Sequence, residues 1–307
     1  MDITWGAGAA NPVIWGWLIA VYLFLAGIAG GAFLTASLTD LFKKNGPAKV
    51  IRSGAFLAPV AIIVGLGLLV FDLGRPLSFW KLIFNVNFGS VMSIGVFIIS
   101  IFTVLSLVYA YLVWASVKVG GKVQVRVGRA ASEAAVAEAG GTAGGREIVA
   151  ILGALFALGT ATYTGFLLSA VSTNVFWSTH LPGISGVPFL PFLFLVSALS
   201  TGLAATLIGA GKCEDLTLYK KIDIVLMVIE ILLVAVLYAS VRSVFFSGNL
   251  AVLFWLGVVV IGLLLPLLFS LYGVSRHKNL VVPTCGMVVI GGLALRCFVV
   301  YAGQLFK

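Results

Sequence analysis

The sequence has 307 residues, of which 61% are hydrophobic and 9% are charged. So few polar side chains cannot cover a water-facing surface, which excludes a soluble globular protein and predicts a protein that crosses a membrane several times. The net charge of +9 does not indicate a nucleic-acid-binding protein, because the basic residues lie in short loops between apolar segments. Residues 1–12 lack the basic start of a signal peptide and a twin-arginine motif, so the first apolar segment is expected to remain in the mature protein.

Eight apolar segments are long enough to cross the membrane as helices, which takes about 20 residues each. We therefore expect an all-α integral membrane protein with eight transmembrane helices. The second segment is short, and its helix could begin as early as Val50. The expected spans are residues 15–38, 54–71, 90–114, 148–171, 187–210, 222–241, 250–272 and 282–305.

Basic residues indicate the orientation of the chain. Most of the 19 lysines and arginines fall in the four loops that follow spans one, three, five and seven. The positive-inside rule places those loops in the cytoplasm, on the inner side of the cytoplasmic membrane. Both termini, and the loop that follows the second span, are then predicted to lie outside.

One low-complexity stretch, residues 118–147, is rich in glycine and alanine and is predicted to be a mobile or partly helical linker. It lies between the first three spans, within residues 1–117, and the fourth span, within residues 148–172. The last four spans occupy residues 187–307. A weak repeat of small residues in spans one and five supports this division into halves and would let helices approach closely.

Histidine and cysteine positions argue against a bound metal group. His180 and His277 both fall in predicted loops, whereas a haem in a helix bundle normally takes axial ligands from within the helices. Cys213, Cys285 and Cys297 are far apart and form no Cys-x-x-Cys unit. We therefore expect no haem, iron–sulfur cluster or metal in this chain.

An aspartate and an arginine stand three residues apart where the second span meets its outer loop, at Asp72 and Arg75. Charged groups at a membrane boundary are costly and often mark functional sites. Alternatively, they only end the helix: Arg75 extends its charge to water, Asp72 pairs with it, and Pro76 prevents continuation. These two residues alone do not decide between the interpretations.

Three further ionisable residues fall inside spans six and eight: Asp223, Glu230 and Arg296. An unpaired charge in lipid is unfavourable, so they should face the interior of the bundle and find partners. A purely structural interpretation is an ion pair between the two spans. A functional one is a proton relay, because Asp223 and Glu230 are seven residues apart and share a helix face.

Aromatic residues near the outer side suggest a ligand site. Tyr22 lies in span one, Tyr163 in span four, and Trp17 at the outer edge of span one. A quinone headgroup needs apolar walls, a donor to each carbonyl and a path for its protons, which tyrosines, an arginine and a carboxylate would supply. The alternative is an ordinary interfacial aromatic belt.

Four stretches together resemble the NrfD / polysulfide-reductase-C family of quinol-interacting membrane subunits. The resemblance runs from the first span to the last, and the Asp-Leu-Gly-Arg-Pro corner is its most specific part. The stretches are residues 22–33, residues 72–76 followed by 90–95, residues 163–168 with Trp177 and Pro182 downstream, and residues 291–296 followed by 301–304.

The resemblance implies two four-helix bundles without haem. It implies a subunit that exchanges electrons between quinone, such as menaquinone, and a ferredoxin-like iron–sulfur subunit. That partner passes electrons to or from a molybdopterin enzyme or a multihaem cytochrome. The implied quinone pocket lies in the N-terminal bundle near the outer face. On this sequence the resemblance assigns it to Tyr22, Asp72, Arg75 and Tyr163, with Trp17 at its edge.

Two details of the implied site depart from the family or extend it. Some relatives have Asn or His in the first helix where this chain has Ile19 and Tyr22, so Tyr22 is the expected headgroup donor. Some members are also proposed to move protons through the C-terminal bundle. The candidates here are Asp223, Glu230 and Arg296.

Two other functions remain open from the sequence. An ion-coupled transporter or proton channel is compatible with the repeat and the carboxylates of span six, although few prolines interrupt the spans. A structural anchor for a peripheral enzyme would need none of the polar residues at the outer boundary.

Overall fold

The computed structural model describes most of the chain, and the statements below concern that part. The described residues are 15–42, 47–72, 87, 89–123, 131–171, 176–181, 186–211, 216–240, 245, 248–275 and 280–305, with side chains left aside at 117–144, 274–275 and 305.

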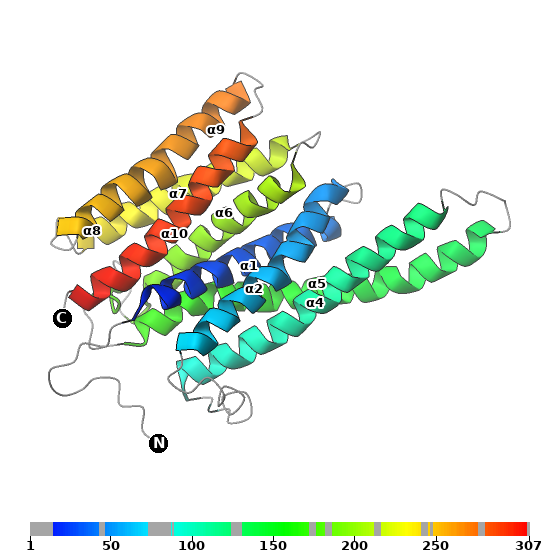
Figure 1. The fold of residues 1–307 in the computed structure, drawn as a ribbon, viewed down its shortest axis with the longest axis horizontal. Helices are drawn as coiled ribbons and strands as arrows, with labels where there is room; N and C mark the ends of the chain where they lie inside the picture. Colours follow the sequence, from blue (N-terminus) through cyan, green and yellow to red (C-terminus); the bar gives the residue numbers. More distant parts are fainter. Residues whose placement is uncertain are drawn as a thin grey trace.

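The described part contains eight helical segments long and apolar enough to cross a membrane, which confirms the expected fold class (Figure 1). The second helix begins earlier than residue 54, as its short apolar segment suggested. The helices are α1 (Trp17–Phe42), α2 (Ala48–Asp72), α4 (Val91–Val123), α5 (Ala131–Ser169), α6 (Leu190–Ala210), α7 (Thr217–Ser240), α8 (Gly248–Val252), η3 (Leu253–Leu264), α9 (Leu265–Ser275) and α10 (Val281–Leu305).

The seventh span is continuous from α8 through η3 to α9. Its central part is a π-helix, in which each N–H bonds to the carbonyl five residues earlier, as the N–H of Leu265 does with Val260. Pro266 follows directly and has no N–H to donate. The backbone returns to α-helical geometry around this proline.

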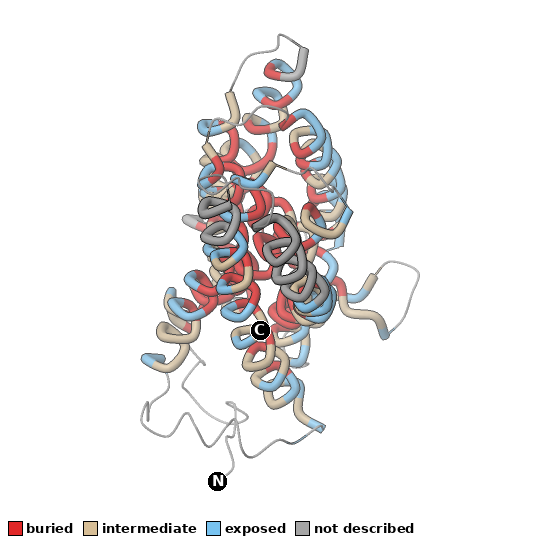
Figure 2. The backbone as a smooth tube through the Cα atoms, turned by 90° about the vertical axis from the view of Figure 1, so that its right-hand side faces the viewer, coloured by how far each residue is buried: buried red, intermediate tan, exposed pale blue. Residues whose placement is uncertain are grey.

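Helix α1 lies at the centre of the molecule, in contact with α2, α5, α6 and α10. Buried residues gather on the inward sides of the helices and exposed ones on the outside (Figure 2). Helices α1, α2, α4 and α5 form contacts in sequence, and so do α6, α7, α9 and α10. Because α1 also packs on α6 and α10, the contacts do not separate the chain into two bundles, and that arrangement stays a prediction.

Glycines let the central helices touch through their backbones. A Cβ atom at Gly31 of α1 would lie 2.0 Å from the carbonyl oxygen of Ala198 in α6, and one at Gly202 would lie 2.4 Å from the Cα of Gly31. The same occurs between Gly262 of η3 and Gly291 of α10, where a Cβ added at Gly291 would be 2.0 Å from a backbone atom. The repeated small residues of spans one and five therefore face each other.

Helices α4 and α5 are longer than a membrane requires. Residues 118–123 continue α4, and residues 131–147 of the predicted linker belong to α5. Their paired ends extend past the other helices, at the end of the molecule away from both termini (Figure 1). We call the end where α1 begins and α10 finishes the terminal end, and the other the loop end.

Candidate functional site

Two buried tyrosines from different helices lie close together in the first half of the chain. Tyr22 of α1 is 1% exposed and Tyr163 of α5 is 6% exposed. Tyr163 is near enough to Tyr22 to affect it electrostatically. Tyr22 also packs on α2, where a Cβ at Gly65 would lie 3.5 Å from its ring, and Tyr163 lies directly on Gly95 of α4. Four helices, α1, α2, α4 and α5, therefore enclose the pair.

The polar atoms of this pair are the two tyrosine hydroxyl groups. Neither is hydrogen-bonded to a residue in the described part of the chain. A buried hydroxyl without a partner is unfavourable, because it loses its bond to water and gains none in return. The arrangement thus offers two hydrogen-bond donors inside an aromatic, apolar setting, which suits a flat molecule with carbonyl groups.

The pair lies inside the membrane, near the terminal end. Gly65 is about two helical turns before the end of α2, and Tyr163 about two turns before the end of α5, or roughly 10 Å from the terminal end. Asp72 is the last residue of α2 and is exposed there. Trp17, at the start of α1, is 60% exposed. Of the predicted pocket residues, then, the structure brings Tyr22 and Tyr163 together and places Asp72 and Trp17 at the rim of the same end, while Arg75 lies outside the described residues.

Asp223 and Glu230 both lie on the buried face of α7, as their seven-residue spacing predicts. The hydroxyl of Ser200 in α6 donates to Oδ1 of Asp223 at 3.4 Å. Asp223 also lines a small cleft near the loop end, together with Lys220 and Cys285. The first carboxylate of the predicted relay is therefore next to an open cleft, and the second lies about two turns deeper.

Arg296 is 1% exposed and is held mainly by α6. Its Nη2 donates to the carbonyl oxygen of Phe194 at 3.1 Å, and its guanidinium carbon lies 3.9 Å from the centre of the Phe194 ring. Glu230 is close enough for electrostatic attraction, but the two side chains do not form a direct ion pair. The cation–π contact and the carbonyl take that place, so the suggestion of a simple ion pair between spans six and eight was wrong.

Several polar atoms of Arg296 and its neighbours are buried. Nε and Nη1 of Arg296 are buried and have no hydrogen-bond partner among the described residues, and Ser197 of α6 lies close to the Glu230 carboxylate. Glu230 lies on the facing side of α7. Buried groups of this kind usually complete their bonds through water.

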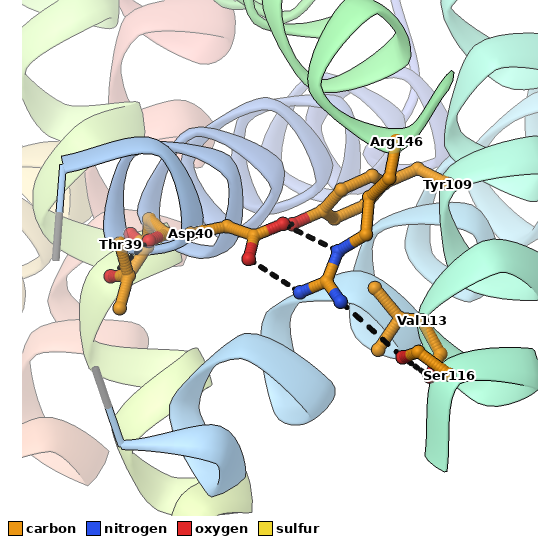
Figure 3. A network of polar contacts seen from close by, with 7 residues as sticks. Thr39, Asp40, Tyr109, Val113, Ser116 and Arg146 are labelled. Atoms are coloured by element: carbon orange, nitrogen blue, oxygen red, sulfur yellow. Dashed lines mark hydrogen bonds and ion pairs between the residues drawn. The ribbon is translucent and has the colours of Figure 1, made fainter. Parts of the chain in front are cut away.

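A polar network at the loop end is not among the sites predicted from the sequence (Figure 3). Asp40 of α1 accepts hydrogen bonds from Nε of Arg146 at 2.6 Å and from the hydroxyl of Tyr109 at 3.0 Å, and its other oxygen pairs with Nη2 of Arg146. Nη1 of the same arginine donates to Ser116 at 3.3 Å. The network joins α1, α4 and α5. The signal for it was an acid near the inner end of span one and an arginine at the start of span four, 106 residues apart.

Two motif residues, Trp177 and Gln304, have structural partners at the terminal end. The indole N–H of Trp177 donates to the carbonyl of Val299 in α10 at 2.8 Å, and its ring centre lies 5.2 Å from that of Trp15. Gln304 donates to the carbonyl of Trp15 at 2.9 Å. These contacts fasten the end of α10 to the start of α1. In the described residues, histidines, cysteines and acids form no group of three that could hold a metal.

The fold and the site define a multi-pass α-helical membrane protein with a buried tyrosine pair in its first half and buried charges in its second. Comparison with known proteins gives its family. The family described as "Polysulphide reductase, NrfD" matches residues 5–307. The chain therefore belongs to the NrfD family, as the sequence motifs predicted.

Three relatives illustrate the range of the family. The protein is 34% identical to the C component of polysulfide reductase from Wolinella succinogenes, over 100% of its own length and 99% of that relative. It is 30% identical to protein NrfD of Escherichia coli, over 96% of each. It is 25% identical to the C component of selenate reductase from Mesobacillus selenatarsenatis, over 91% of its own length and 71% of that relative.

Proposed function

We propose that this chain is the quinone-reactive membrane subunit of a respiratory oxidoreductase complex. The family supports the membrane-subunit part, because its relatives are named as components of reductases whose substrates differ. The observation that carries the quinone part is the enclosed pair Tyr22 and Tyr163, whose two hydroxyls have no other partner among the described residues.

The residues of the site suggest how the reaction runs. The two hydroxyls would bond to the oxygens of a quinone or quinol headgroup and would orient it among α1, α2, α4 and α5. Oxidation of a quinol releases two protons and two electrons. Asp72, exposed at the rim, accepts protons and passes them to water, and Arg75 orients Asp72 or the headgroup. Reduction of a quinone uses the same groups in the opposite direction.

The electrons need an acceptor outside this chain. We place a ferredoxin-like iron–sulfur subunit on the terminal end, roughly 10 Å from the tyrosines, and a molybdopterin or multihaem cytochrome subunit beyond it. Most basic residues lie in the loops at the loop end, which the positive-inside rule assigns to the cytoplasm. In this proposal the terminal end is therefore the outer face of the cytoplasmic membrane. Menaquinone or a similar quinone is the membrane substrate.

Binding of a quinol analogue tests the proposal directly. The fluorescence of 2-heptyl-4-hydroxyquinoline N-oxide is quenched when it binds to quinol sites, so its affinity can be titrated in membranes that contain the complex. Loss of one hydrogen bond should weaken binding about tenfold in Tyr22→Phe or Tyr163→Phe. Tyr111→Phe is the control, because that tyrosine is exposed on α4. Parent-like affinity in both tyrosine variants would show that the site is elsewhere.

Proton movement through the second half is a second candidate function. It is favoured by the succession of the loop-end cleft, Asp223 with Ser200, and Glu230 near Arg296. The complex in vesicles, supplied with quinol and an acceptor, should acidify or alkalise the lumen. Glu230→Gln should abolish the protons moved in excess of quinol chemistry and leave turnover intact. An unchanged proton-to-electron ratio would remove this candidate, and solute uptake by the chain alone would favour a transporter instead.

A further inference from the structure

Gly95, in the second turn of α4, lies directly against a side chain of α5. A Cβ atom built on it would lie 1.8 Å from both Cε2 and Cζ of Tyr163 and 2.4 Å from the Tyr163 hydroxyl oxygen. Real Cβ atoms essentially never approach other atoms within 3.0 Å. The end of the ring that carries the hydroxyl therefore occupies the space that any other residue at position 95 would fill.

Most other close glycines in this protein serve a different purpose. Gly31 and Gly202 accommodate helix backbones, as described above. Gly67 of α2, by contrast, has no atom within 4 Å of its added Cβ. Gly95 is unlike both, because the group it accommodates is the functional end of a side chain in the proposed quinone site.

We propose that Gly95 is a positioning residue for the quinone site: the absence of a side chain there sets the depth at which the Tyr163 hydroxyl stands beside Tyr22. The inference rests on the proposed function of the tyrosine pair. It adds a residue of α4 that acts through the position of the Tyr163 ring.

The residues around Tyr163 restrict how far its ring can move away from position 95. Two residues further along α5, Gly165 lies against the backbone of α6, where an added Cβ would be 2.4 Å from the Cα of Pro191. Helix α5 therefore cannot move towards α6 at this level. Tyr163 is itself only 6% exposed, so other atoms pack against most of its surface.

A methyl group at position 95 must then displace the ring itself. To restore ordinary contact, the Cζ atom has to move by more than an ångström, and the hydroxyl moves with it. A misplacement of about 1 Å at a reacting centre can lower the rate about 100-fold. A purely structural role for Gly95 would instead lower stability and leave the affinity of the folded protein unchanged.

The test uses the whole complex in membranes and compares Gly95→Ala, Tyr163→Phe, the double variant and Gly67→Ala. Titration with 2-heptyl-4-hydroxyquinoline N-oxide gives Kd, and quinol oxidation with an artificial electron acceptor gives kcat and KM. We expect Gly95→Ala to raise Kd about tenfold and to lower kcat/KM by about 10- to 100-fold, mainly through kcat. The double variant should be no worse than the poorer single variant, because both changes act on one hydroxyl. Gly67→Ala should match the parent.

The outcomes separate this inference from the proposed function. Impaired Tyr163→Phe beside parent-like Gly95→Ala overturns the positioning role and leaves the quinone site in place. Parent-like behaviour of both variants overturns the quinone site as well. If the Gly95→Ala variant fails to assemble, a second variant combines Gly95→Ala with Tyr163→Ala. Removal of the Tyr163 ring leaves space for the methyl group and should restore assembly. Failure to restore it would show that Gly95 does not accommodate Tyr163.

Discussion

Replacement of Asp40 by asparagine should destabilise the protein by about 2–3 kcal/mol. Breaking a fully buried ion pair costs about 3–5 kcal/mol and breaking an exposed one about 0–1 kcal/mol. The side chains of Arg146 and Asp40 are 21% and 18% exposed, which places their pair between these limits. Asparagine keeps the shape of the side chain, so the loss reports the charge and the bidentate bonds to Arg146 rather than a cavity.

The measurement is reversible unfolding in mixed micelles, as the fraction of denaturing detergent is increased. Asp40→Asn, Arg146→Gln and their double variant form a cycle whose coupling should be at least about 1 kcal/mol, or about fivefold in the equilibrium constant. Tyr109→Phe removes one hydrogen bond to the same carboxylate and should cost about 1–2 kcal/mol. Arg52→Gln, at an exposed position of the same end, is the matched control and should change stability by less than about 0.5 kcal/mol. Additive single variants, or a loss below about 1 kcal/mol for Asp40→Asn, would refute the reasoning.

Three further predictions concern other contacts. Gly202→Ala should destabilise the protein by about 2–4 kcal/mol in the same unfolding assay because it separates two helix backbones, whereas Gly286→Ala, with open space around its Cβ, should be neutral or slightly stabilising. Trp177→Phe removes the hydrogen bond from the indole to the α10 backbone and should lower the free energy of unfolding by about 1 kcal/mol, measured as a lower thermal midpoint. Arg296→Met should cost about 3 kcal/mol by leaving the Glu230 carboxylate buried without a cation, and adding Glu230→Gln should recover at least about a third of that loss; no recovery would mean that the two side chains are not coupled.

The sequence predicts the helices well, because the membrane requires long apolar segments and rejects charge. All eight spans were found, and the early start of α2 at Ala48 was anticipated from its short apolar core. Periodicity also placed Asp223 and Glu230 on the buried face of α7, since residues seven apart share a face. Such features depend on local sequence alone.

The rest depended on contacts between distant segments. Nothing near Asp40 indicates that Arg146 will neutralise it, and nothing near Arg296 indicates that an aromatic ring and a carbonyl of α6 will hold it in place of a carboxylate. Gly95 lies in one of the stretches that resemble the family. Only the packing of α4 against α5 shows that the Tyr163 side chain lies on it. Prediction from sequence fails where the partner is chosen by tertiary packing.

The central position of α1 has a consequence for how the protein is made. This helix is synthesised before the other seven described spans, yet it has the largest buried share of the eight, 72%. Helix α6, on which its glycine face packs, begins about 150 residues after α1 ends, a delay of roughly 7–30 s at ordinary rates of translation. During that interval the glycine face of α1 is exposed to lipid, α2 or the insertion machinery. A slower ribosome, or a stall before α6, should therefore lead to proteolysis of the nascent chain rather than to a stable first half.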